Sequence, residues 1–71
     1  MNINKLKGKV VENGLNIQRL AERIGMDKST FYRKLNQNGE TFSIKEANLI
    51  SNELELTPEE AASIFFTESV A

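Results

Sequence analysis

Residues 17–36 read IQRLAERIGMDKSTFYRKLN, and this stretch decides the fold because two short helical patterns meet in it at a glycine. The first pattern has the i, i+3, i+4, i+7 spacing of one helix face, with apolar residues at Ile17, Leu20, Ala21 and Ile24. Gly25 stands where a helix end needs a positive φ, and Asp27 stands where the next helix needs an N-cap oxygen. So short a link forces the second helix to cross the first steeply, which predicts a helix-turn-helix.

The second helix is expected from about Lys28 to Asn36, with Phe31 and Leu35 one turn apart and packed back on the first helix. Six other side chains face outward or flank that packing: Lys28, Ser29, Thr30, Tyr32, Arg33 and Asn36. These residue types suit the base edges of a DNA major groove, where arginine can pair with guanine and serine or threonine with several groups. The competing interpretation is that any solvent-exposed helix carries such residues. The tight turn before the helix favours DNA.

The same residues give the chain a resemblance to a known family. Leu20-Ala21, Ile24-Gly25-Met26 and Phe31 match positions of the Cro and phage-repressor (XRE-like) helix-turn-helix proteins, and the likeness covers nearly the whole chain. The resemblance implies a compact all-α domain of five helices, of which the third lies in the major groove. It also implies that two copies bind a near-palindromic operator. Residues 29–36, STFYRKLN, are locally similar to the Fis-type helix-turn-helix as well.

Site residues follow from this resemblance. Lys28, Ser29 and Arg33 are implied to face bases, with Asn36 near the groove wall. The family often has glutamine where Ile17 stands, so phosphate anchoring is expected from Gln18 or Arg19 instead. The family also usually has an apolar residue where Lys34 stands. Leu35 is expected to take over that packing, with a slight rotation of the recognition helix.

The flanking sequence predicts three further helices. The first is expected from about residue 3 to Asn13, where Gly14 ends it, with Lys5, Lys7 and Lys9 on a solvated face. Residues 36–41 are rich in turn formers and are predicted to form a loop, whose amides, near Asn38, are expected to reach phosphates.

A Ser-x-x-Glu capping box at Ser43 predicts the start of the fourth helix, which is expected to run to about Glu55. One face of that helix is predicted to turn inward, with Ile44, Ala47, Ile50, Ser51 and Leu54. The exposed helix start near Ser43 and Lys45 is a candidate phosphate site.

Thr57-Pro58-Glu59-Glu60 predicts the start of a fifth helix, with threonine as N-cap and proline at the first helical position. This helix carries more apolar surface than one face of a short helix can bury. We therefore predict that Phe66, with Val70, contacts a second subunit. The alternative is that Phe65 and Phe66 both complete the core of the monomer.

Composition bounds the possibilities. A chain of 71 residues with 39% hydrophobic content predicts one small domain over residues 1–68, followed by a tail at residues 69–71. It has no Cys and no His, which excludes disulfides and the usual structural zinc, and it suits a reducing cytoplasm. We expect no metal, cofactor, small-molecule substrate or membrane association. Neither a nucleophile–base pair nor a glycine-rich phosphate cradle is visible, so an enzyme is the weakest hypothesis.

The net charge of −1 conceals an uneven distribution. Residues 1–37 carry eight basic and three acidic side chains, a net charge of +5, whereas residues 38–71 carry one basic and seven acidic side chains, a net charge of −6. Charges beyond a Debye length of about 10 Å are largely screened, so the acidic half weakens a DNA contact at the basic half only modestly.

The sequence therefore predicts a DNA-binding transcriptional regulator that acts on double-stranded DNA as a homodimer. Its phage or mobile-element origin is implied by the resemblance alone. The alternative is a protein-interaction module, such as an antirepressor or antitoxin subunit, that retains the fold without DNA binding. Such a module should place apolar residues on the outer face of residues 28–36, where this chain has Lys28, Ser29 and Arg33.

Overall fold

Five helices, each begun by a capping side chain, form the fold in the computed structural model, which describes residues 1–66. They are α1 (Ile3–Glu12), α2 (Ile17–Arg23), α3 (Lys28–Asn36), α4 (Ile44–Glu53) and α5 (Pro58–Phe65). The N-cap side chains accept hydrogen bonds from backbone N–H groups that have no partner within the helix: Asn2, Asn16, Asp27, Ser43 and Thr57. The predicted five-helix, all-α fold is confirmed.

The first four helices also end in one common way. The first N–H beyond each C-cap bonds to a carbonyl three residues back and the next N–H to one five back, which is the Schellman motif. The residue at the turn has a positive φ: +72° at Gly14, +74° at Gly25, +61° at Asn38 and +50° at Glu55. Because Glu55 takes this role, α4 ends at Glu53, and the prediction that it reaches about Glu55 was too long.

Nine apolar side chains form the core, and all five helices contribute to it. They are Leu6, Val10, Leu20, Ala21, Phe31, Leu35, Ile50, Leu54 and Ile64. Ala21 is fully buried, which lets α2 and α3 approach closely beside the turn. Within residues 1–66 the core contains no buried polar or charged residue, so hydrocarbon packing alone fills it.

One predicted core residue is not in the core. Ile44 was expected on the inner face of α4, but it is 76% exposed. Ile44 is the first residue of the helix, and Phe42, just before the cap, packs against the core from this end of α4 instead. The helical period predicts a direction around the axis, but it does not reveal whether another element lies opposite that turn.

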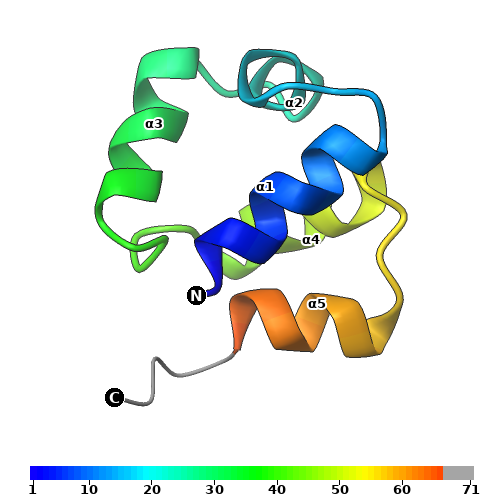
Figure 1. Cartoon of the computed structure of the whole chain (residues 1–71). Coiled ribbons are helices and arrows are strands. Elements are labelled where there is room, and N and C mark those ends of the chain that lie inside the picture. Colours follow the sequence, from blue (N-terminus) through cyan, green and yellow to red (C-terminus); the bar gives the residue numbers. More distant parts are fainter. Residues whose placement is uncertain (67–71) are drawn as a thin grey trace.

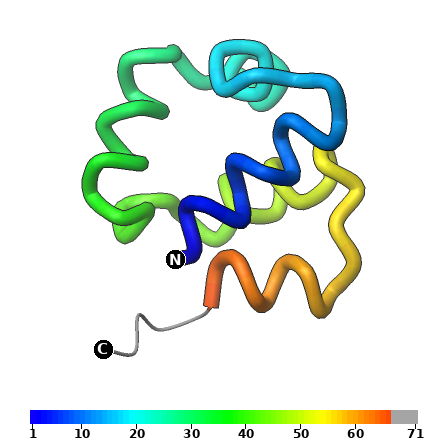
Figure 2. Tube along the Cα trace, in the orientation of Figure 1, coloured from blue at the N-terminus to red at the C-terminus, as the bar shows by residue number. Residues whose placement is uncertain are grey.

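In space, α2 and α3 lie at the top and left of Figure 1, α1 crosses the front, α4 lies behind it and α5 lies below. The tube in Figure 2 shows the start of α1 close to the end of α5. Two hydrogen bonds join these helices, from Asn2 N to Ile64 O at 2.7 Å and from Lys5 Nζ to Ser63 Oγ at 2.6 Å. The most N-terminal and the most C-terminal helices therefore support each other beneath the helix-turn-helix.

Candidate nucleic-acid interface

The turn between α2 and α3 is built as the sequence predicts. Ile24 is the C-cap of α2, Gly25 has a φ of +74°, and the N–H of Met26 donates to Ala21 O at 2.9 Å. Asp27 Oδ2 then accepts the N–H of Ser29 at 2.9 Å and begins α3. Figure 1 shows α2 nearly end-on and α3 along its length, so the two helices cross steeply. The predicted helix-turn-helix is confirmed.

The side chains of α3 divide into a buried face and an outer ridge. Phe31 and Leu35 are buried, and they fix which side of the helix faces the core. At 3.6 residues per turn, the side opposite them carries Ser29, Arg33 and Asn36, all of which are exposed. We call these three residues the outer ridge of α3. Because they are one turn apart in succession, they can enter a groove together.

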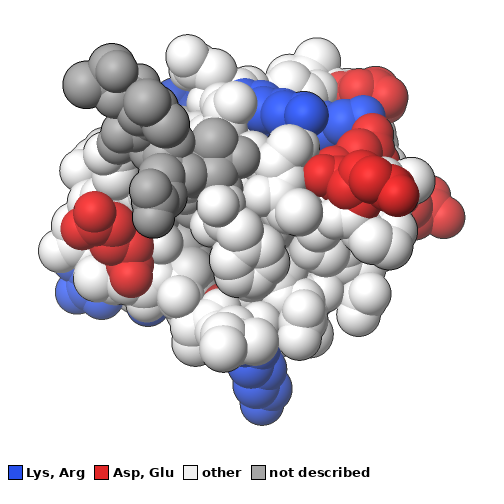
Figure 3. Space-filling model, turned by 90° about the horizontal axis from the view of Figure 1, so that it is seen from below, with Lys and Arg blue, Asp and Glu red and all other residues white. Residues whose placement is uncertain are grey.

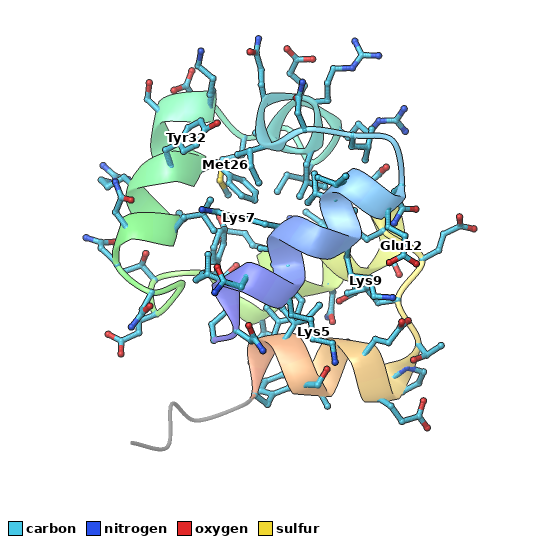
Figure 4. All side chains as sticks on the ribbon, in the orientation of Figure 1. Lys5, Lys7, Lys9, Glu12, Met26 and Tyr32 are labelled. Atoms are coloured by element: carbon cyan, nitrogen blue, oxygen red, sulfur yellow. The ribbon has the colours of Figure 1, made fainter. Side chains whose placement is uncertain are left out.

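The other predicted base-reading residues lie on the flanks of α3. Lys28 and Tyr32 share one flank; Lys28 is exposed, and Tyr32 is 45% exposed. Figure 4 shows Tyr32 projecting from α3 on the side of Met26. Thr30 lies on the opposite flank, is half-buried, and lines a shallow groove together with Ser43 and Lys45 of the α4 N-terminus. Of the five residues, Ser29 and Arg33 are thus the ones that point straight outward.

The predicted phosphate ligands differ in how much of their polar surface is free. Gln18, Arg19 and Lys45 are exposed. Ser43 Oγ accepts the N–H of Glu46 at 3.0 Å, and the N–H of Ser43 donates to Glu46 Oε1 at 2.8 Å, so this residue is engaged in its capping box. The carboxylate of Glu46 therefore already occupies part of this helix start.

Most backbone amides of the loop after α3 are already hydrogen-bonded within the protein. The N–H groups of residues 37–40 all donate to carbonyls of residues 33–37, because they terminate α3. The backbone N–H groups of residues 37–40 are thus already engaged at the end of α3. Asn36 and Asn38 are both exposed, so a phosphate contact from this region is left to their side chains.

Electrostatics separate the cations of the molecule into two groups. Three have carboxylate partners: Lys34 with Glu46 at 3.4 Å, Arg23 with Glu53 at 3.5 Å, and Lys9 with both Glu12 and Glu60. The other six form no ion pair within residues 1–66: Lys5, Lys7, Arg19, Lys28, Arg33 and Lys45. Three of these unpaired cations, Arg19, Lys28 and Arg33, belong to α2 and α3, where a polyanion could neutralise them.

Comparison with protein families agrees with this geometry. A family model described as the Cro/C1-type HTH DNA-binding domain matches residues 5–65. The chain belongs to this family. The resemblance drawn from Leu20-Ala21, Ile24-Gly25-Met26 and Phe31 is thereby confirmed. Comparison with curated proteins and with solved structures gives no match.

For a Cro/C1-type domain, DNA binding and a role in transcription regulation follow from the family. Each helix among residues 1–66 is too short or too polar to cross a membrane. In the same part of the chain, no three His, Cys, Asp or Glu side chains gather to hold a metal ion.

Two features of this Cro/C1-type domain were not predicted from the sequence. Lys34 is folded back against α4, with a side chain only 16% exposed. Lys9 is likewise no member of a solvated face: its side chain is 19% exposed, and its pKa is raised, chiefly by the bond to Glu60. Glu46 lies in another helix than Lys34, and Glu60 lies in another helix than Lys9, so helical spacing carried no signal for these two pairs.

Proposed function

We propose that this Cro/C1-type domain reads a near-palindromic operator as a homodimer, with α3 of each copy in a major groove. The observation that carries the proposal is the outer ridge of α3, together with the unpaired cations beside it. Arg33 stands at the centre of the ridge, exposed and without an ion pair within residues 1–66. A guanidinium left free in this way can pair with the O6 and N7 atoms of a guanine.

Within this proposal, Lys28, Ser29, Thr30, Tyr32 and Arg33 contact bases, and Gln18, Arg19, Asn36, Asn38, Ser43 and Lys45 contact the backbone. The protein acts by occupying its operator, as a phage or mobile-element repressor or Cro-like regulator. It works in the cytoplasm, where the DNA lies, and it performs no catalytic step. It needs no metal, cofactor or small-molecule substrate.

The dimer is proposed to form through an apolar surface at the end of α5. Phe66 is 72% exposed, whereas Phe65 packs against the core. Ile44, which is 76% exposed, lines one groove together with Phe66 and adds to the same surface. Figure 3 views the face that carries α5 and shows an uncharged area at its centre, with charged groups toward its margin. Val70, the other predicted contact, lies outside the described residues.

The DNA proposal is tested by selecting bound sequences from a pool of random duplexes. We expect an enriched motif with two-fold symmetry and half-sites separated by about 34 Å, one turn of DNA. Enrichment of a motif without symmetry would contradict the dimeric arrangement. A protein that enriches no motif at all would contradict sequence-specific reading, and it would favour the interaction module that keeps the fold without binding DNA.

The dimer is tested separately by sedimentation equilibrium at micromolar protein concentration, with and without DNA. We expect Phe66→Ser to shift the wild-type dimer toward monomer, because it removes apolar surface from the contact. Val11→Ser is the matched control, since Val11 is 73% exposed but lies on α1. A wild-type protein that stays monomeric in both conditions would refute the dimer.

A further inference from the structure

Lys34 has an unusual environment for a lysine on a DNA-binding helix. Its side chain is 16% exposed, although lysines rarely leave solvent unless they are paired. The ammonium donates to Thr41 O at 2.9 Å and lies 3.4 Å from Glu46 Oε1. It also lies 5.8 Å from the centre of the Phe42 ring, within the range of a cation–π contact. One side chain of α3 thus contacts both the loop before α4 and the first turn of α4.

The partners of Lys34 are themselves fixed. Glu46 closes the capping box of α4, and its pKa is lowered, first by the backbone N–H of Ser43 and further by Lys34. The Phe42 ring packs edge-on against Phe31, with 5.2 Å between ring centres and 64° between planes. A shift of Lys34 would therefore break several contacts at once.

We propose that Lys34 is a positioning residue for DNA reading, which orients the outer ridge of α3 without touching DNA itself. This inference rests on the proposed function, in which Ser29 and Arg33 of that ridge read base edges. Phe31 and Leu35 hold α3 through apolar packing, which is non-directional and tolerates small rotations about the helix axis. The hydrogen bond from Lys34 to Thr41 O is directional, and the attraction of Glu46 holds the ammonium beside it, so together they favour one rotation. Arg33, the residue just before Lys34, takes its direction from that rotation.

The geometry argues against Lys34 as a phosphate ligand. Lys34 lies on the flank of α3 that faces α4, away from the side that carries Ser29, Arg33 and Asn36. To reach a phosphate, its ammonium would have to give up Thr41 O, Glu46 and the Phe42 ring together. Its effect on DNA binding must then be transmitted through the helix.

The central test is Lys34→Met, which keeps a flexible side chain of similar length and removes the charge. Removing one partner of an ion pair costs stability, because Glu46 loses its cation. Glu46 is, however, 26% exposed and still accepts the N–H of Ser43, so we expect a folded protein with modestly lower thermal stability. Affinity for the duplex selected from the random pool should nevertheless fall about tenfold, within the range for residues of one network. Affinity for unrelated duplexes and the salt slope should stay the same, since no phosphate contact is lost.

Three companion variants separate positioning from simple charge effects. Lys34→Arg should restore most of the specific affinity, because a guanidinium can reach both Thr41 O and Glu46. Glu46→Gln keeps a residue type that supports a capping box and removes a negative charge. A field effect alone would strengthen DNA binding in Glu46→Gln, whereas the positioning role predicts weaker specific binding. Lys34→Met combined with Glu46→Gln should bind about as weakly as Lys34→Met alone.

The outcomes distinguish this inference from the proposed function. If Arg33→Ala removes the sequence preference while Lys34→Met binds the selected duplex like the wild type, only the positioning role is refuted. If Lys34→Met lowers the magnitude of the salt slope by about one unit, Lys34 is a phosphate ligand and the inference is wrong. If neither variant changes the preference, or the wild type selects no duplex, the proposed function fails and this inference fails with it.

Discussion

Within residues 1–66, a cation is paired with carboxylates at the α1–α5 contact, but the cation of the outer ridge of α3 is unpaired. At the α1–α5 contact, Lys9 pairs with Glu12 and Glu60, and Glu60 also closes the capping box of α5 with Thr57. At the ridge, Arg33 has no ion pair within residues 1–66 and points to solvent. The difference teaches that a cation of this domain can serve the fold, by pairing with a carboxylate of another helix, or can stay unpaired and accessible to a polyanion. The unpaired cations, the turn that presents them and the paired cations can each be tested by substitution.

The largest effect on DNA binding is expected at the ridge. Arg33→Ala should cost about 1–3 kcal/mol on the selected duplex and relax the preference at one base position, because a two-pronged contact with guanine is lost. Binding to unrelated duplexes should fall much less. Lys9→Ala is the matched control, since it also removes one positive charge but acts at the α1–α5 contact.

Circular dichroism must show that both variants remain folded, and titrations of the selected and an unrelated duplex give the affinities. If Arg33→Ala, even combined with Lys28→Ala and Ser29→Ala, keeps the wild-type preference, the outer face of α3 does not read bases. The interaction-module hypothesis would then take the lead.

The next effect concerns the turn that presents the ridge. Gly25→Ala should destabilise the fold by about 1–2 kcal/mol, because a Cβ is strained at this positive φ although it would touch no neighbour. Gly8→Ala is the control: Gly8 lies inside α1 with nothing within 4 Å of an added Cβ, so the variant should gain about 0.5–1 kcal/mol. Thermal denaturation measures both. Changes of the same sign would refute the assignment of strain to the turn.

A smaller effect is predicted for Arg19, the open cation of α2. If Arg19 neutralises a phosphate, Arg19→Ala should weaken binding to all duplexes alike and lower the magnitude of the salt slope by about one unit. Titrations over a range of salt concentrations measure the slope. A loss confined to the selected duplex would mean that Arg19 reads a base.

The smallest effect is a pH dependence at the α1–α5 contact. The bond to Lys9 lowers the pKa of Glu60 from 4.5 to about 2, with help from the backbone N–H of Thr57. A lowered pKa means that ionised Glu60 stabilises the fold above pH 4.5, and that this contribution disappears as the pH falls toward 2. Glu60→Gln should therefore be less stable than the wild type at neutral pH, and the difference should shrink over that window.

Thermal unfolding of both proteins between pH 7 and pH 2 provides the measurement, with other carboxylates titrating equally in each. The effect should be modest because both side chains remain partly exposed, at 19% for Lys9 and 30% for Glu60. A stability difference that does not vary with pH would show that the charge of Glu60 does not contribute to stability.

The elements that could be predicted from the sequence are those whose signals are local. Four helix starts were predicted from N-cap residues within four positions of the helix, and each of these side chains accepts the expected backbone hydrogen bond: Asn16, Asp27, Ser43 and Thr57. The end of α4 escaped prediction because its turn residue is Glu55 and not a glycine. Glu55 takes the left-handed conformation without any sequence signal for it.

The candidate site, too, could be predicted only where its signals are local. The division of α3 into buried and outward residues follows from Phe31 and Leu35, which the period of the helix identifies. The pairing of Lys34 with Glu46 could not be predicted, because it depends on how a loop returns the chain to α3. Lys34 looked instead like a misplaced polar residue at a position that the family usually fills with an apolar one.

The buried core of residues 1–66 contains only hydrocarbon, and this has a consequence for how such a protein evolves. Phe31 and Leu35, which hold α3, are different residues from Ser29 and Arg33, which face outward. Codon changes at the outward positions leave every core contact intact, so under the proposed base reading a lineage can acquire a new target sequence in few steps and without an unstable intermediate. Duplicated copies of the gene can then diverge into regulators that ignore each other's operators.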